Sequence, residues 1–338
     1  MTANLCQYSL ILKQVNTMIV ITGAAGFIGS CLISKLNSEG FNDLVLVDDF
    51  TKLEKVKNYE SKSFSLKVSR NVFFDWAEKN AYQIQFIYHI GARTDTSEFD
   101  IKLLNELNFE YTKQIWNLCV KEGIPLVYAS SAATYGMGET GFSDDNDNIH
   151  GLKPLNPYGN SKQLFDEWAM LQEKKPYFWV GLKFFNVYGP NEYHKGRMAS
   201  VVFHSFNQIK DKGQLNLFKS HRDDYKDGEQ KRDFVYVKDV VNVLYFWLHH
   251  RQDSGIYNLG SGRANTFNAL ANSIFNALNV NPKINYIETP IDIRDKYQYY
   301  TQANMEKLKS VGYSQEFFSI EEGVKDYVQN YLINNSYF

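Results

Sequence analysis

The sequence is poor in cysteine and nearly balanced in charge. Its three cysteines form no CxxC pair and no closely spaced even set, which indicates a reducing compartment, predicts a cytoplasmic protein and argues against structural zinc. The 36 basic and 38 acidic residues give a net charge of −2, and the basic residues are scattered along the chain. We therefore expect no nucleic-acid partner and no broad contact with a membrane surface.

Long apolar runs are missing as well. No stretch reaches the ~20 residues that span a bilayer, and the apolar centre of segment 1–17 is too short for a signal peptide. We expect segment 1–17 to be an N-terminal extension outside the fold. Internal repeats and low-complexity segments do not occur, and an apolar fraction of 44% over 338 residues is enough to bury a core of one or two lobes.

Strand-like apolar runs alternate with helical patterns along the chain. These runs cover residues 18–22, 44–49, 86–92, 124–136, 179–189 and 233–241. Such alternation predicts an α/β fold with a Rossmann-type, doubly wound parallel sheet. After residue 262 the pattern becomes helix, strand, helix, which predicts a smaller C-terminal α/β lobe.

Glycines follow the first strand-like run in the pattern GAAGFIG, at Gly23, Gly26 and Gly29, where a helical pattern begins. A strand, glycine turn and helix in this order let the backbone approach a pyrophosphate and direct free helical N–H groups at the anion. Asp48 lies about 20 residues further on, where a carboxylate accepts hydrogen bonds from ribose hydroxyls. The pattern predicts a bound dinucleotide.

The residues around Asp48 leave the choice between NAD and NADP open. A carboxylate there repels a 2′-phosphate and so favours NAD. Lys52, Lys55 and Lys57 follow closely, and they either neutralise such a phosphate or form a solvated helix face.

Tyr158 and Lys162 form a YxxxK pattern, which places both side chains on one face of a helix. The lysine ammonium and the positive nicotinamide of an oxidised cofactor lower the pKa of the phenol, so that it can act as a base near neutral pH. Ser131 ends a preceding strand-like run and is placed to hydrogen-bond the same substrate oxygen. We predict that these three residues are catalytic.

Six motifs in order carry a resemblance to a known family. GAAGFIG, SSAATYG, PLNPYGNSK, FFNVYGPNE, KRDFVYV and YNLGSGR resemble the extended short-chain dehydrogenase/reductases of the NAD-dependent epimerase/dehydratase type, over nearly the whole chain from Met18. The resemblance implies a Rossmann cofactor domain over 18–186 and about 233–262, and a nucleotide-sugar lobe over 187–232 and 263–338. It also implies NADP, with NAD as the alternative, and a homo-oligomer.

Local sequence narrows the reaction. Sugar-nucleotide 4,6-dehydratases carry an Asp-Glu pair after the serine, whereas Ala132 and Ala133 follow Ser131 here, so water elimination has no proton donor. The segments FNVYGPNEYHKGRMASVVFH and KYQYYTQA instead resemble the subgroup that epimerises ADP-heptose at C6″ for the lipopolysaccharide inner core. That resemblance implies oxidation to a ketone, reorientation of the sugar and return of hydride to the opposite face, with Tyr158 and Lys195 as the two acid/base groups.

The resemblance also assigns contact residues. Cofactor contacts are implied for Gly23, Gly26, Phe27, Ile28, Gly29, Asp48, Asp49, Lys55, Arg70, Gly91, Ala92, Arg93, Thr94, Asn108, Lys162, Val187 and Lys195. Substrate contacts are implied for Ser131, Asn186, Arg197, His204, Phe218, Lys219, Ser220, His221, Arg232 and Tyr297.

Some of these assignments have alternatives. Arg232 is the expected diphosphate ligand because a guanidinium binds phosphate oxygens in a fork, but a surface ion pair with Asp233 is the alternative. Arg70 is either a cofactor contact or a surface residue. Arg197 stands where the family commonly has a small serine, and Asp49 where it often has asparagine. The 222–231 loop is longer than the family pattern, which makes the Phe218 to His221 contacts the least secure.

Two other functions stay open. A UDP-hexose 4-epimerase shares the serine, tyrosine and lysine group, and a regulatory module would bind NADP without chemistry. His89, His150 and His194 are too scattered for a metal site, so we expect no metal and take His194 as a residue that shapes its loop.

Overall fold

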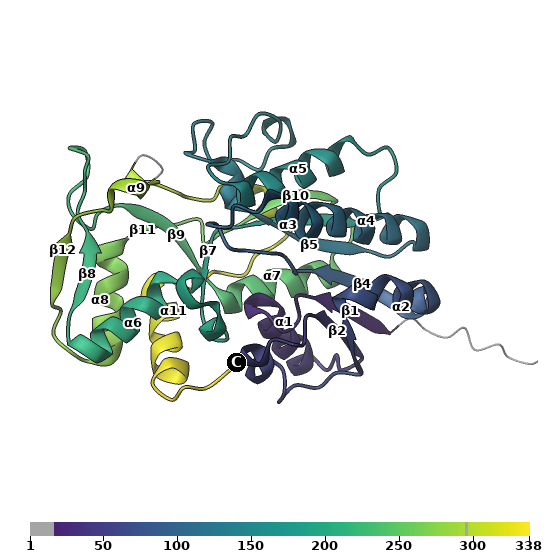
Figure 1. Cartoon of the computed structure of the whole chain (residues 1–338), viewed down its shortest axis with the longest axis horizontal. Helices are drawn as coiled ribbons and strands as arrows, with labels where there is room; N and C mark the ends of the chain where they lie inside the picture. The colour runs from purple at the N-terminus through teal and green to yellow at the C-terminus, as the bar shows by residue number, and fades with distance from the viewer. Residues whose placement is uncertain (1–16, 295–296) are drawn as a thin grey trace, which may run out of the picture.

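The structure is a computed structural model that describes residues 17–294 and 297–338; residues 1–16 of the expected extension lie outside it. In the described part, a seven-stranded sheet has the order β10-β6-β5-β4-β1-β2-β3, and every neighbouring pair is parallel (Figure 1). Its strands are β1 (Met18–Thr22), β2 (Leu44–Asp48), β3 (Leu66–Ser69), β4 (Ile84–His89), β5 (Leu126–Ser131), β6 (Trp179–Phe184) and β10 (Gly255–Leu259). The order runs outward from β1 in both directions, so the predicted doubly wound α/β fold is confirmed.

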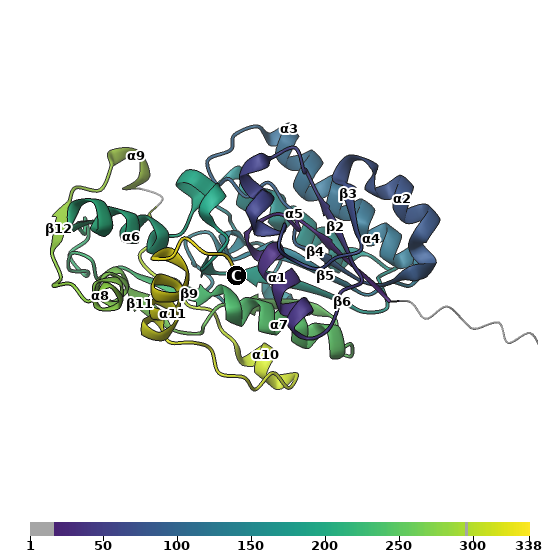
Figure 2. The same cartoon turned by 90° about the horizontal axis from the view of Figure 1, so that it is seen from below.

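Helices cover both faces of this sheet (Figure 2). One face packs against α1 (Phe27–Ser38) and α7 (Val237–His249). The other packs against α2 (Phe73–Asn80), α4 (Tyr111–Glu122) and α5 (Pro157–Leu171), and the short α3 (Ile101–Leu104) lies before α4. In β1, Ile19 and Ile21 join the first core and Val20 the second. Burial on both faces explains why the strand runs are almost wholly apolar.

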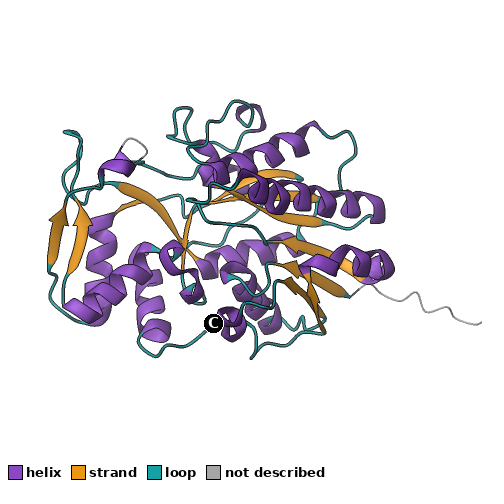
Figure 3. Cartoon of the chain, in the orientation of Figure 1, coloured by secondary structure: helices purple, strands orange, loops and turns teal. Residues whose placement is uncertain are grey.

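A smaller group of elements lies at the left of Figure 3, beyond the carboxyl ends of the large sheet. It contains a three-stranded sheet of β7 (Asn186–Tyr188), β9 (Lys231–Tyr236) and β11 (Ala264–Thr266), and a two-stranded sheet of β8 (Leu215–Phe218) and β12 (Ile284–Ile287). Its helices are α6 (Val201–Lys212), α8 (Phe267–Leu278), α9 (Ile291–Arg294) and α11 (Ile320–Tyr327). The short α10 (Glu306–Ser310) lies against β10 of the large sheet, where Lys307 Nζ donates to the Ile256 carbonyl at 2.8 Å.

Three of the strands expected from the sequence are shorter in the structure. The run 233–241 ends as a strand at Tyr236, and α7 begins at Val237 because Val237, Val240, Val241 and Leu244 repeat at helical spacing and are all buried. The run 179–189 is divided at Phe185 between β6 of the large sheet and β7 of the small one. The run 124–136 ends as a strand at Ser131, and a 3₁₀ helix over residues 132–135 follows.

Strand β3 was not predicted. Only Val68 of its four residues is buried, because β3 is the edge strand of the sheet and its sequence carries little apolar signal. Among the described residues, no helix is long and apolar enough to cross a membrane.

Candidate active site

A cavity of about 300 Å³ lies at the carboxyl ends of β1, β4, β5 and β6. The strand order reverses between β1 and β4, and ligands of open parallel sheets bind at such a reversal. The predicted site residues that line the cavity are Phe27, Ile28, Ala92, Thr94, Ser131, Tyr158, Lys162, Asn186, Val187 and Lys195. The fold therefore brings the predicted catalytic group and Lys195 to one place.

The glycine turn between β1 and α1 is closely packed. Gly23 has a φ of 68°, and a Cβ on it would lie 2.6 Å from the backbone of Gly91, which follows β4. A Cβ on Gly29 would lie 2.2 Å from the Gly23 carbonyl oxygen. Gly26 caps α1 without a side-chain hydrogen bond, so the first N–H groups of the helix stay available to an anion. The turn fits the pyrophosphate of a dinucleotide.

Asp48 ends β2 with its carboxylate held by the protein. It accepts hydrogen bonds from the backbone N–H groups of Ala25 at 3.0 Å and Asp49 at 2.7 Å, and Lys55 Nζ lies 3.1 Å away. Arg70 lies 4.0 Å from the Asp49 carboxylate and is half-buried. Two acidic and two basic side chains thus meet where the adenosine ribose is expected, and Lys55 is an ion-pair partner rather than a solvated residue.

Tyr158 and Lys162 lie on the first two turns of α5, and both are buried. The helix starts there because Asn156 accepts the Gly159 N–H at 2.8 Å and Pro157 occupies the first helical position. Lys162 Nζ donates to the Ala129 carbonyl at 2.8 Å, next to the strand end that carries Ser131. The expected one-face arrangement of tyrosine and lysine is present.

Burial dominates the titration of the catalytic group. It raises the pKa of Tyr158, and the hydrogen bond from Ser131 opposes this only in part. It lowers the pKa of Lys162 to about 8, and the negative charge of Asp166 opposes that shift. The pKa of the phenol therefore lies above its ordinary value in the protein alone, so Lys162 by itself does not offset the effect of burial.

Lys195 lies in a short 3₁₀ segment, residues 193–198, across the cavity from α5. Its Nζ is 5.4 Å from the centre of the Phe27 ring, and burial lowers its pKa while the Glu192 carboxylate opposes the shift. The charge that acts on Lys195 is thus negative. The partial desolvation expected for an acid/base lysine is present.

The segment before Lys195 is anchored on every side. The side chain of the buried Asn191 exchanges hydrogen bonds with the backbone of Phe338, at 2.9 and 3.1 Å. Glu192 accepts from the Ser200 hydroxyl at 2.7 Å, and the His194 ring lies 3.1 Å from the Asn58 amide. Burial lowers the pKa of His194 to about 4, so this histidine is neutral, and its contact with Asn58 agrees with the expectation that it shapes its loop. The backbone that carries Lys195 is consequently fixed.

Asn108 holds the segment after β4 instead of presenting a free amide. It accepts the Arg93 N–H at 2.7 Å and donates to the Arg93 carbonyl at 3.0 Å and to the Ser161 hydroxyl at 2.9 Å. The Arg93 side chain turns to Glu98, 2.9 Å away. Asn108 therefore positions the 91–94 backbone, and through it Ala92 and Thr94 on the cavity wall.

Several predicted substrate residues lie outside the cavity lining, mainly in the small lobe. Arg232 is buried, and its guanidinium lies between the rings of Phe267, at 5.8 Å, and Tyr297, at 5.4 Å. Asp233 turns the other way and accepts the Ser261 N–H at 2.6 Å, so the alternative of an ion pair between Arg232 and Asp233 is wrong. A buried guanidinium stacked on aromatic rings suits a diphosphate.

Two residues of segment 218–221 lie near Arg232 and Tyr297. The ring centres of Phe218 and His221 are each 6.3 Å from the ring centre of Tyr297. Lys219 is instead paired with Glu288 at 2.9 Å, and the Ser220 N–H donates to Asp227 at 2.7 Å. His204 is exposed on α6. Arg197 is largely exposed and pairs with Asp95 at 2.9 Å.

The sequence analysis did not predict every residue of the cavity or of the aromatic cluster around Arg232 and Tyr297. Cavity residues that were not predicted are Ile90, Ala129, Ser130, Phe184, Phe185, Met198, Ala199, Ser200, Val201, Val202 and Phe234. Near Tyr297, the Arg222 guanidinium lies over the rings of Tyr225 and Tyr299, at 5.6 and 5.0 Å. Position at a carboxyl strand end signals Ile90, Ala129, Ser130, Phe184 and Phe185, but no sequence pattern signals the others or the residues near Tyr297. Over residues 17–294 and 297–338, no group of three His, Cys, Asp or Glu residues could hold a metal ion.

The chain is similar to known proteins over almost its whole length. The family model described as "NAD dependent epimerase/dehydratase family" matches residues 19–260. The chain is 48% identical to the ADP-L-glycero-D-manno-heptose-6-epimerase of Fusobacterium nucleatum subsp. nucleatum, over 93% of this chain and 98% of that protein. It is 44% identical to the protein of the same name from Nitratidesulfovibrio vulgaris, again over 93% and 98%.

Solved structures give the same fold. The crystal structure of Helicobacter pylori ADP-L-glycero-D-manno-heptose-6-epimerase has a TM-score of 0.79 and 28% identity, and covers 94% of this chain and 97% of its own. The UDP-N-acetylglucosamine 4-epimerase from Methanobrevibacter ruminantium M1 has a TM-score of 0.80 at 21% identity, over 95% and 99% of the two chains. The second likeness concerns the fold alone.

Proposed function

This chain belongs to the NAD dependent epimerase/dehydratase family, and we propose that it converts ADP-D-glycero-β-D-manno-heptose to ADP-L-glycero-β-D-manno-heptose at C6″. The observation that carries this proposal is that Tyr158 on α5 and Lys195 in the 193–198 segment line one cavity. Inversion through a ketone needs proton transfer to oxygen in two orientations, which two separate acid/base groups can serve. Relatives at 44 and 48% identity bear the name of this activity.

A nicotinamide cofactor follows from the family, and the packed glycine turn with the uncapped start of α1 suits its pyrophosphate. When bound, the cofactor accepts hydride from the sugar carbon and returns it. We propose NADP, because Lys55 and Arg70 stand beside the ribose position and can neutralise a 2′-phosphate. Asp48 and Asp49 favour NAD instead. Mass spectrometry of the cofactor released on denaturation decides between the two.

The protein's own residues move the protons. For one epimer, Tyr158 takes the proton of the C6″ hydroxyl, while the Ser131 hydroxyl hydrogen-bonds the same oxygen. For the other epimer, the oxygen lies toward Lys195, whose desolvated amine gives or takes the proton. Lys162, bonded to the Ala129 carbonyl, provides positive charge beside the phenol.

The small lobe would hold the rest of the substrate. Arg232 is proposed to bind the diphosphate in a fork, with the rings of Phe218 and Tyr297 beside it. The product would enter the heptose region of lipopolysaccharide, with the reaction in the cytoplasm. We also propose a homo-oligomer, which light scattering on the purified protein tests.

The direct test is incubation of the purified protein with ADP-D-glycero-β-D-manno-heptose and, separately, with UDP-hexoses, with products identified by NMR. Inversion of the heptose alone supports the proposal. Conversion of a UDP-hexose would assign a 4-epimerase instead, and retained cofactor without turnover on any nucleotide sugar would assign a binding module. Tyr158→Phe and Lys195→Met are then compared, and full turnover of Lys195→Met would exclude the second acid/base role.

A further inference from the structure

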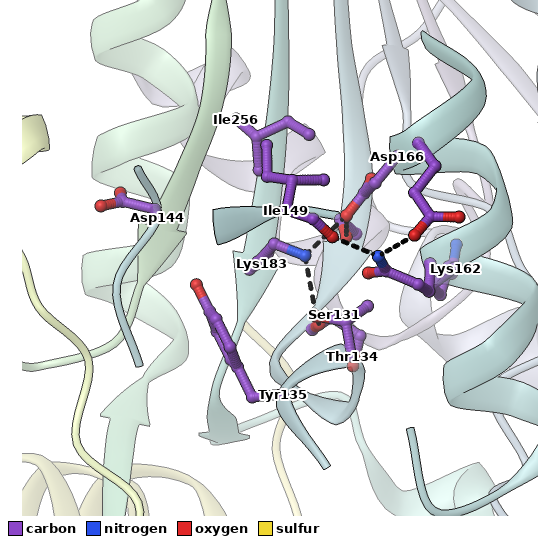
Figure 4. Close-up of polar contacts among 12 residues, drawn as sticks. Ser131, Thr134, Tyr135, Asp144, Ile149, Lys162, Asp166, Lys183 and Ile256 are labelled. Carbon is purple, nitrogen blue, oxygen red and sulfur yellow. Dashed lines mark hydrogen bonds and ion pairs between the residues drawn. The ribbon is translucent and has the colours of Figure 1, made fainter. Parts of the chain in front are cut away.

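A buried ion pair lies behind the catalytic group. Lys183 on β6 and Asp166 on α5 have no exposed side-chain surface, and Lys183 Nζ lies 2.7 Å from Asp166 Oδ2 (Figure 4). Lys183 interrupts an otherwise apolar strand, WVGLKF, at the centre of the fold. Taking two charges out of water is unfavourable unless hydrogen bonds compensate, so a pair kept in this place calls for a reason beyond packing.

The hydrogen bonds of the pair connect four parts of the fold. Asp166 Oδ1 accepts from the Tyr128 hydroxyl at 3.0 Å, and Oδ2 accepts from the Ser130 hydroxyl at 2.6 Å. Lys183 Nζ also donates to the Thr134 hydroxyl at 2.7 Å and lies 5.2 Å from the centre of the Tyr135 ring. The pair thereby joins β5, β6, α5 and the 132–135 turn.

These bonds lead directly to the residues that would do the chemistry. The Thr134 hydroxyl, held by Lys183, donates to the Ser131 carbonyl at 2.8 Å. Asp166 follows Lys162 by one helical turn and Tyr158 by two, so all three lie along one side of α5. Lys183 and Asp166 thus hold both the strand that carries Ser131 and the helix that carries Tyr158.

The pair also sets the charge near the phenol. The Asp166 carboxylate acts to raise the pKa of Tyr158 and that of Lys162. Two cations, Lys162 on the same helix and Lys195 across the cavity, line the cavity with Tyr158, and Lys183 is the ion-pair partner of Asp166. His89, from β4, is neutral, because burial lowers its pKa to about 3.

We propose that Lys183 and Asp166 are positioning residues for the Ser131, Tyr158 and Lys162 group: together they fix the Ser131 backbone to α5, and Lys183 balances the Asp166 charge two helical turns from Tyr158. This inference rests on the proposed role of Tyr158 as a base. Removal of one member should leave an uncompensated buried charge two helical turns from Tyr158, whereas removal of both should not.

The test is the titration of Tyr158 itself, followed by NMR in protein labelled on the tyrosine ring carbon, with oxidised cofactor bound and the signal assigned by its loss in Tyr158→Phe. Lys183→Met leaves the Asp166 charge unbalanced and should raise the pKa of Tyr158. Asp166→Asn leaves the Lys183 charge unbalanced and should lower it. Each change should alter the acid dissociation constant roughly tenfold.

Two further variants separate charge from structural damage. The double variant Asp166→Asn with Lys183→Met should bring the Tyr158 titration back toward that of the unaltered protein. Lys238 and Asp326 form an ion pair of 2.6 Å outside the cavity lining. Lys238→Met breaks this pair and should leave the Tyr158 titration unchanged. If Lys183→Met does not fold, a Tyr158 pKa that falls in Asp166→Asn and returns in the double variant supports the proposal, and an unchanged Tyr158 pKa in Asp166→Asn overturns it.

Shifts of opposite sign in the two single variants support the proposal, since loss of packing alone gives no such pattern. Shifts of one sign, or an unchanged Tyr158 titration, overturn it. The Tyr158 titration can be measured in a protein without catalytic activity. Failure of the unaltered protein to epimerise ADP-heptose would therefore reject the proposed function, and the titration would still test the role of Lys183 and Asp166. In an active enzyme, both single variants should lower kcat more than they change KM.

Discussion

Arg197 and Asp95 form an ion pair of 2.9 Å that joins the segment carrying Lys195 to the segment after β4. Arg93 lies 3.8 Å from the same carboxylate, and the Ser97 hydroxyl donates to it at 2.7 Å. The hydrogen bonds from Ser97 and Arg197 lower the pKa of Asp95 to about 2. Both segments contribute to the cavity wall, through Thr94 and Lys195, so the pair crosses its edge.

The substitution Arg197→Ser tests whether this pair matters for substrate. Because Arg197 is largely exposed, its loss should lower the free energy of unfolding by less than about 1 kcal/mol in urea titrations. If Arg197 also contacts the substrate, as predicted, KM for ADP-heptose should rise with kcat nearly unchanged. The matched control is Asp95→Asn, which breaks the same pair but keeps the guanidinium. An equal rise of KM in both variants would show that only the ion pair matters.

Arg232→Lys tests the diphosphate site. The substitution keeps the positive charge but loses the fork and the stacking between Phe267 and Tyr297, so KM should rise about tenfold or more, with a smaller effect on kcat. Steady-state kinetics on ADP-heptose give both constants. Arg263→Lys, at an exposed arginine of the same lobe, serves as the control and should leave both unchanged. An unaltered KM in Arg232→Lys would remove Arg232 from the substrate site.

The sequence predicted the parts of the site that are local. The glycine turn needs only a strand, close backbone contacts and a helix start within a few residues, and Tyr158 and Lys162 need only one helical turn. Both features were therefore predicted at the correct residues. Strand β3 was missed because an edge strand with one buried residue has almost no apolar pattern.

Contacts between distant segments could not be predicted in this way. Lys183 reads as one polar residue in a buried strand, and nothing nearby in the sequence indicates that Asp166 and Thr134 surround it. The same holds for Arg197, whose partner Asp95 lies in a different segment. Position in the sheet decides these pairings, and the sheet order itself is a property of the whole chain.

Gly29→Ala tests the packing of the glycine turn. The new Cβ would lie 2.2 Å from the Gly23 carbonyl oxygen, which is backbone and cannot move aside cheaply. We expect a loss of about 1–3 kcal/mol in the free energy of unfolding and loss of bound cofactor, measured by absorbance of the purified protein. The control is Gly312→Ala. Gly312 has a φ of 98° and no atom lies within 4 Å of the new Cβ, so this substitution introduces backbone strain without a steric clash. The control should be destabilised yet keep its cofactor; full cofactor content in Gly29→Ala would argue against a pyrophosphate at this turn.

His89 should make stability depend on pH in the acid range. Its two ring nitrogens lie 2.6 Å from the Thr22 hydroxyl and 3.0 Å from that of Thr112, and burial lowers its pKa from 6.5 to about 3. The unfolded chain binds a proton near pH 6.5 and the folded chain only near pH 3. The contribution of the neutral histidine is therefore complete above pH 6.5 and is lost progressively as the pH falls toward 3.

The variant His89→Gln removes this titration. We expect it to be less stable than the unaltered protein at neutral pH, because the hydrogen bonds to the two threonines are disturbed, and to lose less stability between pH 6.5 and 3. Urea titrations across that range give the slope of the free energy of unfolding against pH. In His89→Gln this slope should fall by about the amount that uptake of one proton on unfolding contributes. His150→Gln, at an exposed histidine, should keep the original slope. Equal slopes in His89→Gln and the unaltered protein would mean that acid instability arises from other groups, since a histidine that stays neutral in the fold must take up its proton on unfolding.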